Sequence, residues 1–568
     1  MSPVEESWQS KAARAQQSVI DSIPLKWRLP PGTAATREKN ARQVILSSNL
    51  LTKKQIEITE LTATQLLESI HHGNLSCVEA MEAFLIRTAI AHQLVNCLVE
   101  FMPEEALARA AVLDAEYKKS GKVVGPLHGL PMSVKDILDV EGKIVTFAAV
   151  AWVDCAPSKT DASVVKVMRD AGAVFIARTT MPQTGMALET VSNLWGRTLN
   201  AHNPAFGSGG SSGGEAVLTA LRGTPASPLS TDIGGSIRAP AAFNGLYAMR
   251  PTSERCPHLG GKTAAPGNVS VKVSAGPACW SMTDLKLFVH QILTHPTIPH
   301  EPTCCIPYWN EVPAPSGRLR VGVMVTDGVV DPHPPIQRAI RETTAKLKAA
   351  GHDVFEFKPP FDLWEAALTT WALYFQTGAR EVLELLASAG EPPIKQFELN
   401  LKIFKTKELT VAELFKRNVE QGAYKIAFQQ AWDAVAGGMD CIVCPCAPMA
   451  GVPHDAPLWW GYTTWLNLLD YPSIIMPVKD LVINPAQDPK DLSYQPRDNP
   501  FDKANHELCE SQLRYTPAWH VLTHADDPEM WQGHPVTLQL VGRPYRDEGL
   551  ISVCEVIDSI VNVPADVV

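Results

Sequence analysis

The sequence predicts an α/β fold in which helices cover both faces of a β-sheet. Three observations lead to this prediction: segments with helical periodicity, short apolar runs typical of buried strands, and the alternation of the two along the chain. The clearest unit is the apolar run 318–325, followed by a helical pattern over 335–350 and a second apolar run at 352–357. Gly351 stands where the predicted helix ends, and glycine commonly follows a helix.

The same helix-then-strand order occurs earlier in the chain. Ser76 and Asp161 each precede a periodic apolar segment, and side chains of these types cap the free N–H groups of a first helical turn. The run AVFIA at 173–177 then predicts a buried strand.

The chain as a whole is predicted to consist of a helical N-terminal extension over 1–60 and a single domain over 61–568. Pro30 and Pro31 interrupt the helical pattern of the extension. The stretch 479–527 is rich in Asp and Pro and has little periodicity, so we expect a surface insertion there.

Composition excludes several classes of protein. The 568 residues include 50 Lys+Arg against 60 Asp+Glu, a net charge of −10 that argues against non-specific nucleic-acid binding. The 12 cysteines are scattered, which is typical of reduced thiols. The start lacks the order of a secretory signal, and no run of about 18 apolar residues predicts a membrane span. We therefore expect a cytoplasmic protein that binds neither nucleic acid nor membrane.

The densest chemical signal is GSGGSSGGE at 207–215. A flexible linker is a poor explanation, since nine residues are few for a spacer and apolar residues follow at once. A phosphate loop is weak too, because the segment lacks GxxxxGK[ST]. The remaining interpretation is a backbone that folds tightly around Ser211 and Ser212.

A second cluster, STDIGGSIRAP at 230–240, follows closely. Its two glycines precede Ser236, and consecutive amides in such a turn form a nest for negative charge. A serine there could attack a carbonyl while the amides hold the oxyanion. Taken alone, the segment is better explained as an ordinary glycine turn with a buried serine.

The third segment is GPLHGLPMSVKD at 125–136, where Lys135 lies in an apolar stretch. Such a lysine usually reaches the surface or pairs with a neighbour such as Asp136. The functional alternative is a desolvated lysine with a lowered pKa that acts as a base.

In this order the three segments resemble the motifs of the amidase signature family. That resemblance implies an amidase-signature fold, with a mixed β-sheet flanked by α-helices on both faces. Within the family, fungal acetamidase-type amidases are the most similar group. Further matching blocks are MPQTGMALETVSNLWGRTLN (181–200), GYTTWLNLLDYPS (461–473), SAGPACWSMTDL (274–285), LLDYPSIIMPV (468–478) and HPVTLQLVGRPYRDE (534–548).

Carried over residue by residue, the resemblance implies a Ser–Ser–Lys triad. Ser236 matches the acylated nucleophile, Lys135 the general base, and Ser211 the bridging serine, which in this family follows a cis peptide bond. Ser212 matches a supporting position. The remaining matches are the oxyanion amides of Ile233, Gly234, Gly235 and Ser236, the acyl-pocket position Gly185, and the supporting positions Thr231, Asp232 and Arg238.

The serine pair shows one departure from the family pattern. The stretch 224–235 is one residue longer than usual, so counting back from Ser236 reaches Ser212 rather than Ser211. We assign the extra residue to a loop at 225–230 and retain Ser211, since GGSSGGE is intact.

The implied function is hydrolysis of a small-molecule carboxylic amide to the acid and ammonia or an amine, with no cofactor and no metal. A homo-oligomer is compatible with this reading. The alternatives are a glutaminase-type subunit of a tRNA amidotransferase, a fatty-acid amide hydrolase and a catalytically inactive binding relative. The length and the acetamidase-like blocks argue against the first, and the absence of an obvious membrane-binding segment weakens the second. The intact Lys135, Ser211 and Ser236 argue against the third.

Three further features have competing interpretations. DCIVCPC at 440–446 has C-x-x-C-x-C spacing, but no second ligand pair lies nearby in the sequence, so we expect a buried strand rather than a metal site. His128 is expected to be structural. The Trp-rich segment 457–465 could line a substrate pocket or belong to the core.

Overall fold

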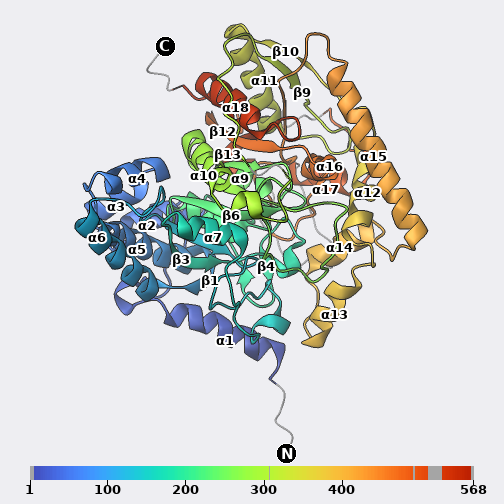
Figure 1. The fold of residues 1–568 in the computed structure, drawn as a ribbon. Coiled ribbons are helices and arrows are strands. Elements are labelled where there is room, and N and C mark those ends of the chain that lie inside the picture. Colours follow the sequence, from blue (N-terminus) through green and yellow to red (C-terminus); the bar gives the residue numbers. More distant parts are fainter. Residues whose placement is uncertain (1–5, 306–307, 490–492, 510–527, 564–568) are drawn as a thin grey trace, which may run out of the picture.

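The computed structural model describes residues 6–305, 308–489, 493–509 and 528–563. A mixed eight-stranded sheet forms its centre (Figure 1). Three neighbouring strands at one edge run parallel and the remaining neighbours are antiparallel. In spatial order the strands are β10 (Asp353–Glu356), β9 (Arg320–Val323), β11 (Cys441–Cys444), β13 (Pro535–Val541), β12 (Ser473–Val482), β7 (Tyr247–Arg250), β8 (Ser274–Cys279) and β6 (Ala226–Asp232).

A second, three-stranded sheet carries the lysine segment. Its central strand β3 (Val174–Thr179) pairs antiparallel with β1 (Leu98–Phe101) and parallel with β2 (Pro131–Lys135). The edge strand β2 packs beside β6 of the main sheet, which brings Lys135 towards the Gly/Ser segments. A two-stranded ribbon, β4 (Val191–Ser192) and β5 (Gly196–Arg197), lies apart from both sheets.

Helices surround the sheets, so the predicted α/β architecture with a flanked mixed sheet is confirmed. The helices of the first half are α1 (Trp8–Asp21), α2 (Ala41–Ser47), α3 (Lys53–Glu60), α4 (Ala63–His71), α5 (Cys77–Val95), α6 (Pro103–Ser120), α7 (Ser163–Asp170), α8 (Gly213–Ala220) and α9 (Arg238–Phe243). Those of the second half are α10 (Met282–Thr294), α11 (Pro334–Ala349), α12 (Leu363–Tyr374), α13 (Arg380–Ser388), α14 (Lys395–Ile403), α15 (Val411–Asp433), α16 (Gly461–Leu469), α17 (Pro500–Cys509) and α18 (Asp547–Val561).

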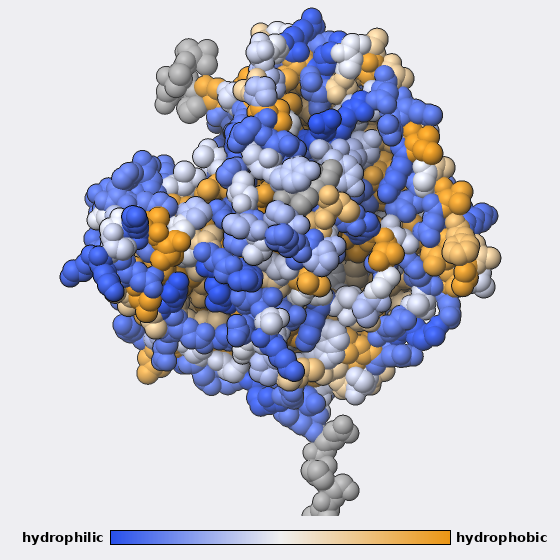
Figure 2. Space-filling model, viewed as in Figure 1, coloured by the Kyte–Doolittle hydropathy of each residue, from blue (hydrophilic) through white to orange (hydrophobic). Residues whose placement is uncertain are grey.

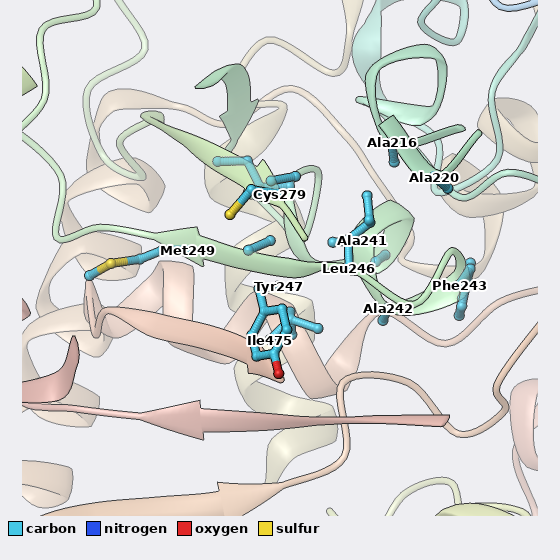
Figure 3. Close-up of a cluster of buried hydrophobic side chains, with 14 of the residues drawn as sticks. Ala216, Ala220, Ala241, Ala242, Phe243, Leu246, Tyr247, Met249, Cys279 and Ile475 are labelled. Atoms are coloured by element: carbon cyan, nitrogen blue, oxygen red, sulfur yellow. The ribbon is translucent and has the colours of Figure 1, made fainter. Parts of the chain in front are cut away.

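Two short helices pack on the sheet through small side chains. Ala216 and Ala220 of α8 and Ala241 and Ala242 of α9 are buried together with apolar residues of β7 and β12 (Figure 3). Alanine lets these backbones approach the sheet closely, and a close-packed interior resists displacement. Helix α8 begins directly after the serine pair and α9 directly after residue 237, so this packing fixes both Gly/Ser segments.

Most predicted elements are present. The apolar runs and the helix between them form β9, α11 and β10, and Gly351 follows α11 with a φ of +89°. The 173–177 run forms β3. Ser76 caps α5, its side chain accepting the Glu79 N–H in a capping box.

The predicted cap at Asp161 is wrong. Ala162 holds the N-cap position of α7 and makes no side-chain cap. The Asp161 carboxylate instead accepts the Glu141 N–H at 2.9 Å and pairs with Arg169. A tertiary partner and an arginine in the last turn of the helix therefore hold this carboxylate in place of the local amides.

Residues 6–60 form helices that are interrupted around Pro30 and Pro31. Ala12, Ala15 and Val19 of α1 are buried, and α2 and α3 pack on α5. The Gln16 side chain also donates to the Leu194 carbonyl at 2.7 Å. The boundary at residue 60 stays a prediction.

The expected surface insertion over 479–527 is wrong in part. Strand β12 continues to Val482, and Phe501 and Asp502 are buried in the body of the protein. The Arg338 guanidinium also binds Asp488 at 2.6 Å. Residues 490–492 and 510–527 of this prediction lie outside the described residues.

An exposed apolar stripe runs along α15. Val411, Phe415, Val419 and Ile426 share one face of this helix and are 58% to 73% exposed. Figure 2 shows this patch at the right-hand edge of the molecule, where α15 lies in Figure 1. Within the described ranges, none of the helices combines the length and apolar character needed to cross a bilayer.

Candidate active site

Lys135 ends strand β2 and is completely buried. Its Nζ donates to the Ser211 Oγ at 2.7 Å and to the Thr231 Oγ1 at 3.1 Å. Burial lowers the pKa of Lys135 to about 7, although the carboxylates of Asp232 and Glu215 act in the opposite direction. Near neutral pH this amine can therefore both take up and release a proton.

The structure brings Ser211, and not Ser212, to the lysine. Ser211 follows a cis peptide bond with Gly210. The Ser212 hydroxyl points elsewhere and donates to the Thr231 carbonyl at 3.4 Å, while the Ser212 N–H donates to the Ser236 carbonyl at 3.0 Å. Ser212 thus ties the two Gly/Ser segments together.

The extra residue before the second segment lies in a β-bulge. Strand β6 pairs Ser227 with Ala278 and Ser230 with Gly276, so β6 advances three residues where β8 advances two. The bulge holds one additional residue in the stretch where we placed it. The expected loop is wrong, since the stretch is strand from Ala226 onward.

Ser236 follows the two glycines of the second segment and is 2% exposed. Its Oγ has no hydrogen-bond partner among the described residues, and no Ser211–Ser236 hydrogen bond is formed. Both serines line one cavity, so a substrate atom could reach the two hydroxyls. Catalytic hydrogen bonds are often open in a free enzyme and tighten when substrate binds.

Three of the four amides that we expected to bind an oxyanion are unpaired within the described part of the chain. The N–H groups of Ile233, Gly234 and Ser236 have no acceptor among the residues that the structure describes. The Gly235 N–H, in contrast, donates to the Asp232 Oδ1 at 2.8 Å, so it is not available to a ligand. Gly235 has a φ of +126°, and a Cβ there would lie 2.5 Å from the Thr463 Oγ1, so only glycine fits this turn.

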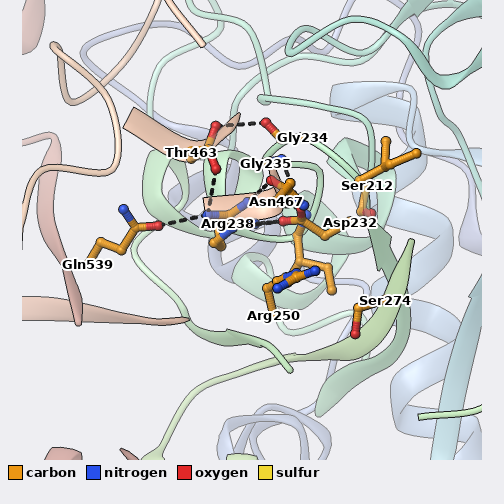
Figure 4. A network of polar contacts seen from close by, with 12 residues as sticks. Ser212, Asp232, Gly234, Gly235, Arg238, Arg250, Ser274, Thr463, Asn467 and Gln539 are labelled. Carbon is orange, nitrogen blue, oxygen red and sulfur yellow. Dashed lines mark hydrogen bonds and ion pairs between the residues drawn. The ribbon is translucent and has the colours of Figure 1, made fainter. Parts of the chain in front are cut away.

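A buried ion pair between Asp232 and Arg238 stabilises the turn at 233–236. The Asp232 carboxylate binds the Arg238 guanidinium at 3.0 Å and also accepts the Ile237 N–H. Burial alone would raise the pKa of Asp232, but Arg238 and Asn467 hold that pKa well below its usual range. Arg238 in turn reaches Gln539 of β13 (Figure 4). The turn is thereby fixed to the main sheet.

Two hydroxyls that sequence reasoning missed hold the carbonyls of the turn. The Tyr374 hydroxyl donates to the Ile233 carbonyl at 2.6 Å, and the Thr463 hydroxyl to the Gly234 carbonyl at 2.7 Å. Thr463 stands inside the acetamidase-like block 461–473, which was the only sequence signal available. Nothing in the sequence around Tyr374 pointed to the site.

A cavity of about 470 Å³ opens beside these groups. The segment 254–273 covers one side of it, and α12 and the start of α13 form another wall. Of the expected site residues, those in its lining are Gly185, Ser211, Thr231, Ile233 and Ser236.

The remaining competing interpretations are decided by burial. The Trp-rich segment belongs to the core, since Trp459, Trp460 and Trp465 are at most 2% exposed and do not line this cavity. His128 is buried, and its Nδ1 accepts the Val124 N–H at 3.2 Å, as expected of a structural histidine.

The cysteine run forms the buried strand β11, as expected. Cys441, Cys444 and Cys446 are buried free thiols, and burial raises the pKa of each. Across the described part of the chain, no three His, Cys, Asp or Glu side chains are grouped so that they could hold a metal ion.

Comparison with known proteins shows the family of the chain. A family model described as Amidase matches residues 79–551. An amidase of Gibberella zeae is 46% identical over 98% of this chain and 99% of its own length, and an acetamidase of Emericella nidulans is 33% identical over 97% of both. A solved structure of a fatty acid amide hydrolase superimposes with a TM-score of 0.89 at 31% identity, covering 98% of this chain and 96% of that one. The chain is therefore an amide hydrolase and belongs to the amidase family.

Proposed function

We propose that this chain hydrolyses a carboxylic amide to the acid and ammonia or an amine through an acyl-serine intermediate on Ser236. The observation that carries the proposal is the 2.7 Å contact between the Lys135 Nζ and the Ser211 Oγ, on a cavity that Ser236 also lines. A serine needs a base within reach to act as a nucleophile, and a neutral lysine can be that base.

In the acylation step, the Ser236 Oγ attacks the amide carbon as its proton passes to Ser211 and the Ser211 proton passes to Lys135. The carbonyl π electrons move onto the oxygen, which the N–H groups of Ile233, Gly234 and Ser236 stabilise. The oxyanion then re-forms the C=O bond as the C–N bond breaks, and the leaving nitrogen takes a proton back from Lys135 through Ser211. An ester on Ser236 remains.

In the deacylation step, water takes the place of the amine. Lys135 accepts a water proton through Ser211, the resulting hydroxide adds to the ester carbon, and the same amides hold the second oxyanion. The C–O bond to Ser236 breaks, and the proton returns to its Oγ. Each proton transfer uses only Lys135, the two serines and water.

Covalent labelling tests this proposal. A fluorophosphonate should add to Ser236, since displacement of fluoride by an activated serine mimics acylation, and peptide mass spectrometry should find the adduct there. Hydrolysis is measured in parallel on aliphatic amides, benzamides and glutamine. Activity confined to glutamine would favour the glutaminase alternative, and labelling of another residue would overturn the assignment of the nucleophile.

The two neighbouring serines should differ sharply in their effect on rate. We expect Ser211→Ala to lower kcat by at least about 10²-fold, since a general acid–base contribution of this kind is typically about 10²–10⁴-fold. Ser212→Ala is the matched control and should cost far less, because its hydroxyl makes one 3.4 Å contact to a carbonyl. Steady-state kinetics of both variants decides the point. A larger loss for Ser212→Ala would transfer the bridging role to Ser212.

We also propose that the acyl group of the substrate is larger than acetyl. The cavity of about 470 Å³ falls in the range of about 300–1,000 Å³ that holds drug-sized ligands, far more than a methyl group fills. Apolar side chains from several elements line it: Leu138, Phe147, Met186, Phe375 and Val382. The names of the relatives extend from acetamidase to fatty acid amide hydrolase, and the cavity favours the bulkier substrates.

The rate should therefore increase with acyl length. Each buried methylene contributes about 0.8 kcal/mol, which corresponds to about a fourfold increase in kcat/KM. We expect this increase from acetamide at least to hexanamide, measured as ammonia release. Val382→Phe should shorten the preferred chain, while Val411→Phe on the exposed face of α15 should leave the series unchanged. A maximum at acetamide would refute the assignment.

A further inference from the structure

We propose that Tyr374 is a positioning residue of this reaction, and that its hydroxyl aims the Gly234 N–H at the oxygen of the substrate carbonyl. The inference rests on the proposed acyl-serine mechanism and adds to it a residue from outside the three motifs.

The first argument is the geometry of one peptide group. The Tyr374 hydroxyl donates to the Ile233 carbonyl at 2.6 Å. The only cis peptide bond among the described residues is Gly210–Ser211, so the 233–234 peptide is trans. In a trans peptide the N–H points opposite to the C=O. Holding the Ile233 oxygen therefore fixes the direction of the Gly234 N–H, away from the phenol.

The second argument is that this N–H lacks a partner. Gly234 is buried, yet its amide has no acceptor among the residues described. Buried backbone N–H groups are almost always hydrogen-bonded, because an unpaired one costs free energy. Ser236, whose hydroxyl is likewise unpaired, lies two residues further along the same turn. An oxygen bound at Ser236 is the acceptor that this arrangement lacks.

The third argument is that Gly234 packs closely against Tyr374 and Trp460. A Cβ built on Gly234 would lie 2.8 Å from the Tyr374 hydroxyl oxygen and 3.1 Å from the ring of Trp460. The neighbouring Gly234 carbonyl is held separately by Thr463 at 2.7 Å. The two carbonyls are thus bound by different hydroxyls, and each bond sets the direction of the N–H that follows it.

The fourth argument is that Tyr374 is itself fixed. It is the last residue of α12, and the Asn268 Nδ2 donates to the carbonyls of Leu373 and Tyr374 at 3.0 and 2.9 Å. These carbonyls lack partners within the helix, so the asparagine acts as a C-terminal cap. Asn268 belongs to the segment 254–273 that covers the cavity. The segment 254–273 and the turn that carries the Gly234 N–H are thereby connected through the C-terminal end of α12.

The chemistry of the phenol suits a permanent donor. Burial, with a contribution from Asp232, raises the pKa of Tyr374, so the hydroxyl stays protonated over the working pH range. A carbonyl oxygen can only accept, so the direction of the hydrogen bond is fixed.

Tyr374→Phe removes this one hydroxyl. Loss of an oxyanion donor costs about 10²–10³-fold in kcat, and loss of its support should cost less, so we expect a fall of about 10- to 100-fold with KM changed by less than about twofold. A trifluoromethyl ketone, whose adduct with Ser236 carries the oxyanion, should bind more weakly by a similar factor. The matching trifluoromethyl carbinol, which forms no adduct and carries no negative charge, should bind as before.

Tyr247→Phe is the matched control. It removes the hydroxyl of another buried tyrosine, which donates to the Asp558 carboxylate at 2.6 Å and does not line the cavity. This variant should leave both kinetic constants unchanged. Asn268→Asp is a second variant, which keeps the shape but removes the donor to the end of α12. It should lower kcat in the same way, to a smaller extent, and it provides the test if Tyr374→Phe does not fold.

The outcomes separate this inference from the function on which it rests. A wild-type enzyme without labelling at Ser236 would overturn the mechanism itself. With wild-type labelling intact, an unchanged kcat in folded Tyr374→Phe would overturn the positioning role. Tyr374 also lines the cavity, so a higher KM at unchanged kcat would limit its role to substrate binding and overturn the positioning role. An equal loss in Tyr247→Phe would overturn it too, because that result would indicate a general effect on the fold.

Discussion

Ser236→Ala is expected to abolish amide hydrolysis and fluorophosphonate labelling while leaving the fold unchanged. Without the Oγ no acyl-enzyme can form, so the rate should fall by at least about 10³-fold. The hydroxyl has no hydrogen-bond partner among the described residues, so its removal leaves no buried partner unsatisfied. The thermal midpoint should accordingly stay close to that of the wild type.

The control for this variant is Ser230→Ala. Ser230 is also buried, and its Oγ also lacks a partner in the described chain, but it lies in the bulged strand β6. It should retain activity and labelling. Kinetics, gel labelling and thermal unfolding of both variants complete the test. Activity of Ser236→Ala within about tenfold of the wild type, or about 1.4 kcal/mol of barrier, would exclude Ser236 as the nucleophile.

The second large effect is expected at Lys135, through the pH dependence of the rate. Only the neutral amine can accept the Ser211 proton, and burial lowers the pKa of Lys135 to about 7. Below that pH the amine is charged and inactive, and above it the amine is free. Wild-type kcat/KM should therefore rise with pH through about 7 and then reach a plateau.

Two substitutions separate a base from a fixed charge. Lys135→Arg keeps a positive charge that is not lost at any working pH, so it should fail almost as badly as Lys135→Ala. Lys135→Ala should also flatten the rise in whatever activity survives. Lys143→Arg serves as the control, because Lys143 pairs with Glu100 and Glu105 and makes no hydrogen bond with the serines of the site. A Lys135→Arg variant with most of the wild-type rate would show that the lysine acts as a fixed charge.

Much of the fold was predictable because its signals are local. The β9, α11 and β10 unit and the cap at Ser76 follow from periodicity and from hydrogen bonds within one helical turn. The prediction that Asp161 caps a helix was wrong because several donors compete for a carboxylate, and here Arg169 and the Glu141 N–H bind it. The prediction of a surface insertion over 479–527 was wrong in part, because polar composition does not reveal that Phe501 is buried.

The sequence by itself determined the chemistry available at the site. Residue type makes Lys135, Ser211, Ser236 and the glycine turn candidates, because a nucleophile, a base and a nest of amides each require particular side chains or their absence. Each segment alone is ambiguous, and the roles were assigned through the resemblance of the three segments together to the amidase signature motifs.

Tertiary structure decided which of these groups meet and how they are aimed. The packing of β2 beside β6 selects Ser211 over Ser212, and Asp232 takes the Gly235 N–H out of the nest. Tyr374 and Thr463 reach the turn from 141 and 229 positions away along the chain. A hydrogen bond forms or is lost when the distance between donor and acceptor changes by a few tenths of an ångström, and here the two groups come from elements far apart in sequence. No local pattern encodes such distances, so only the folded chain shows them.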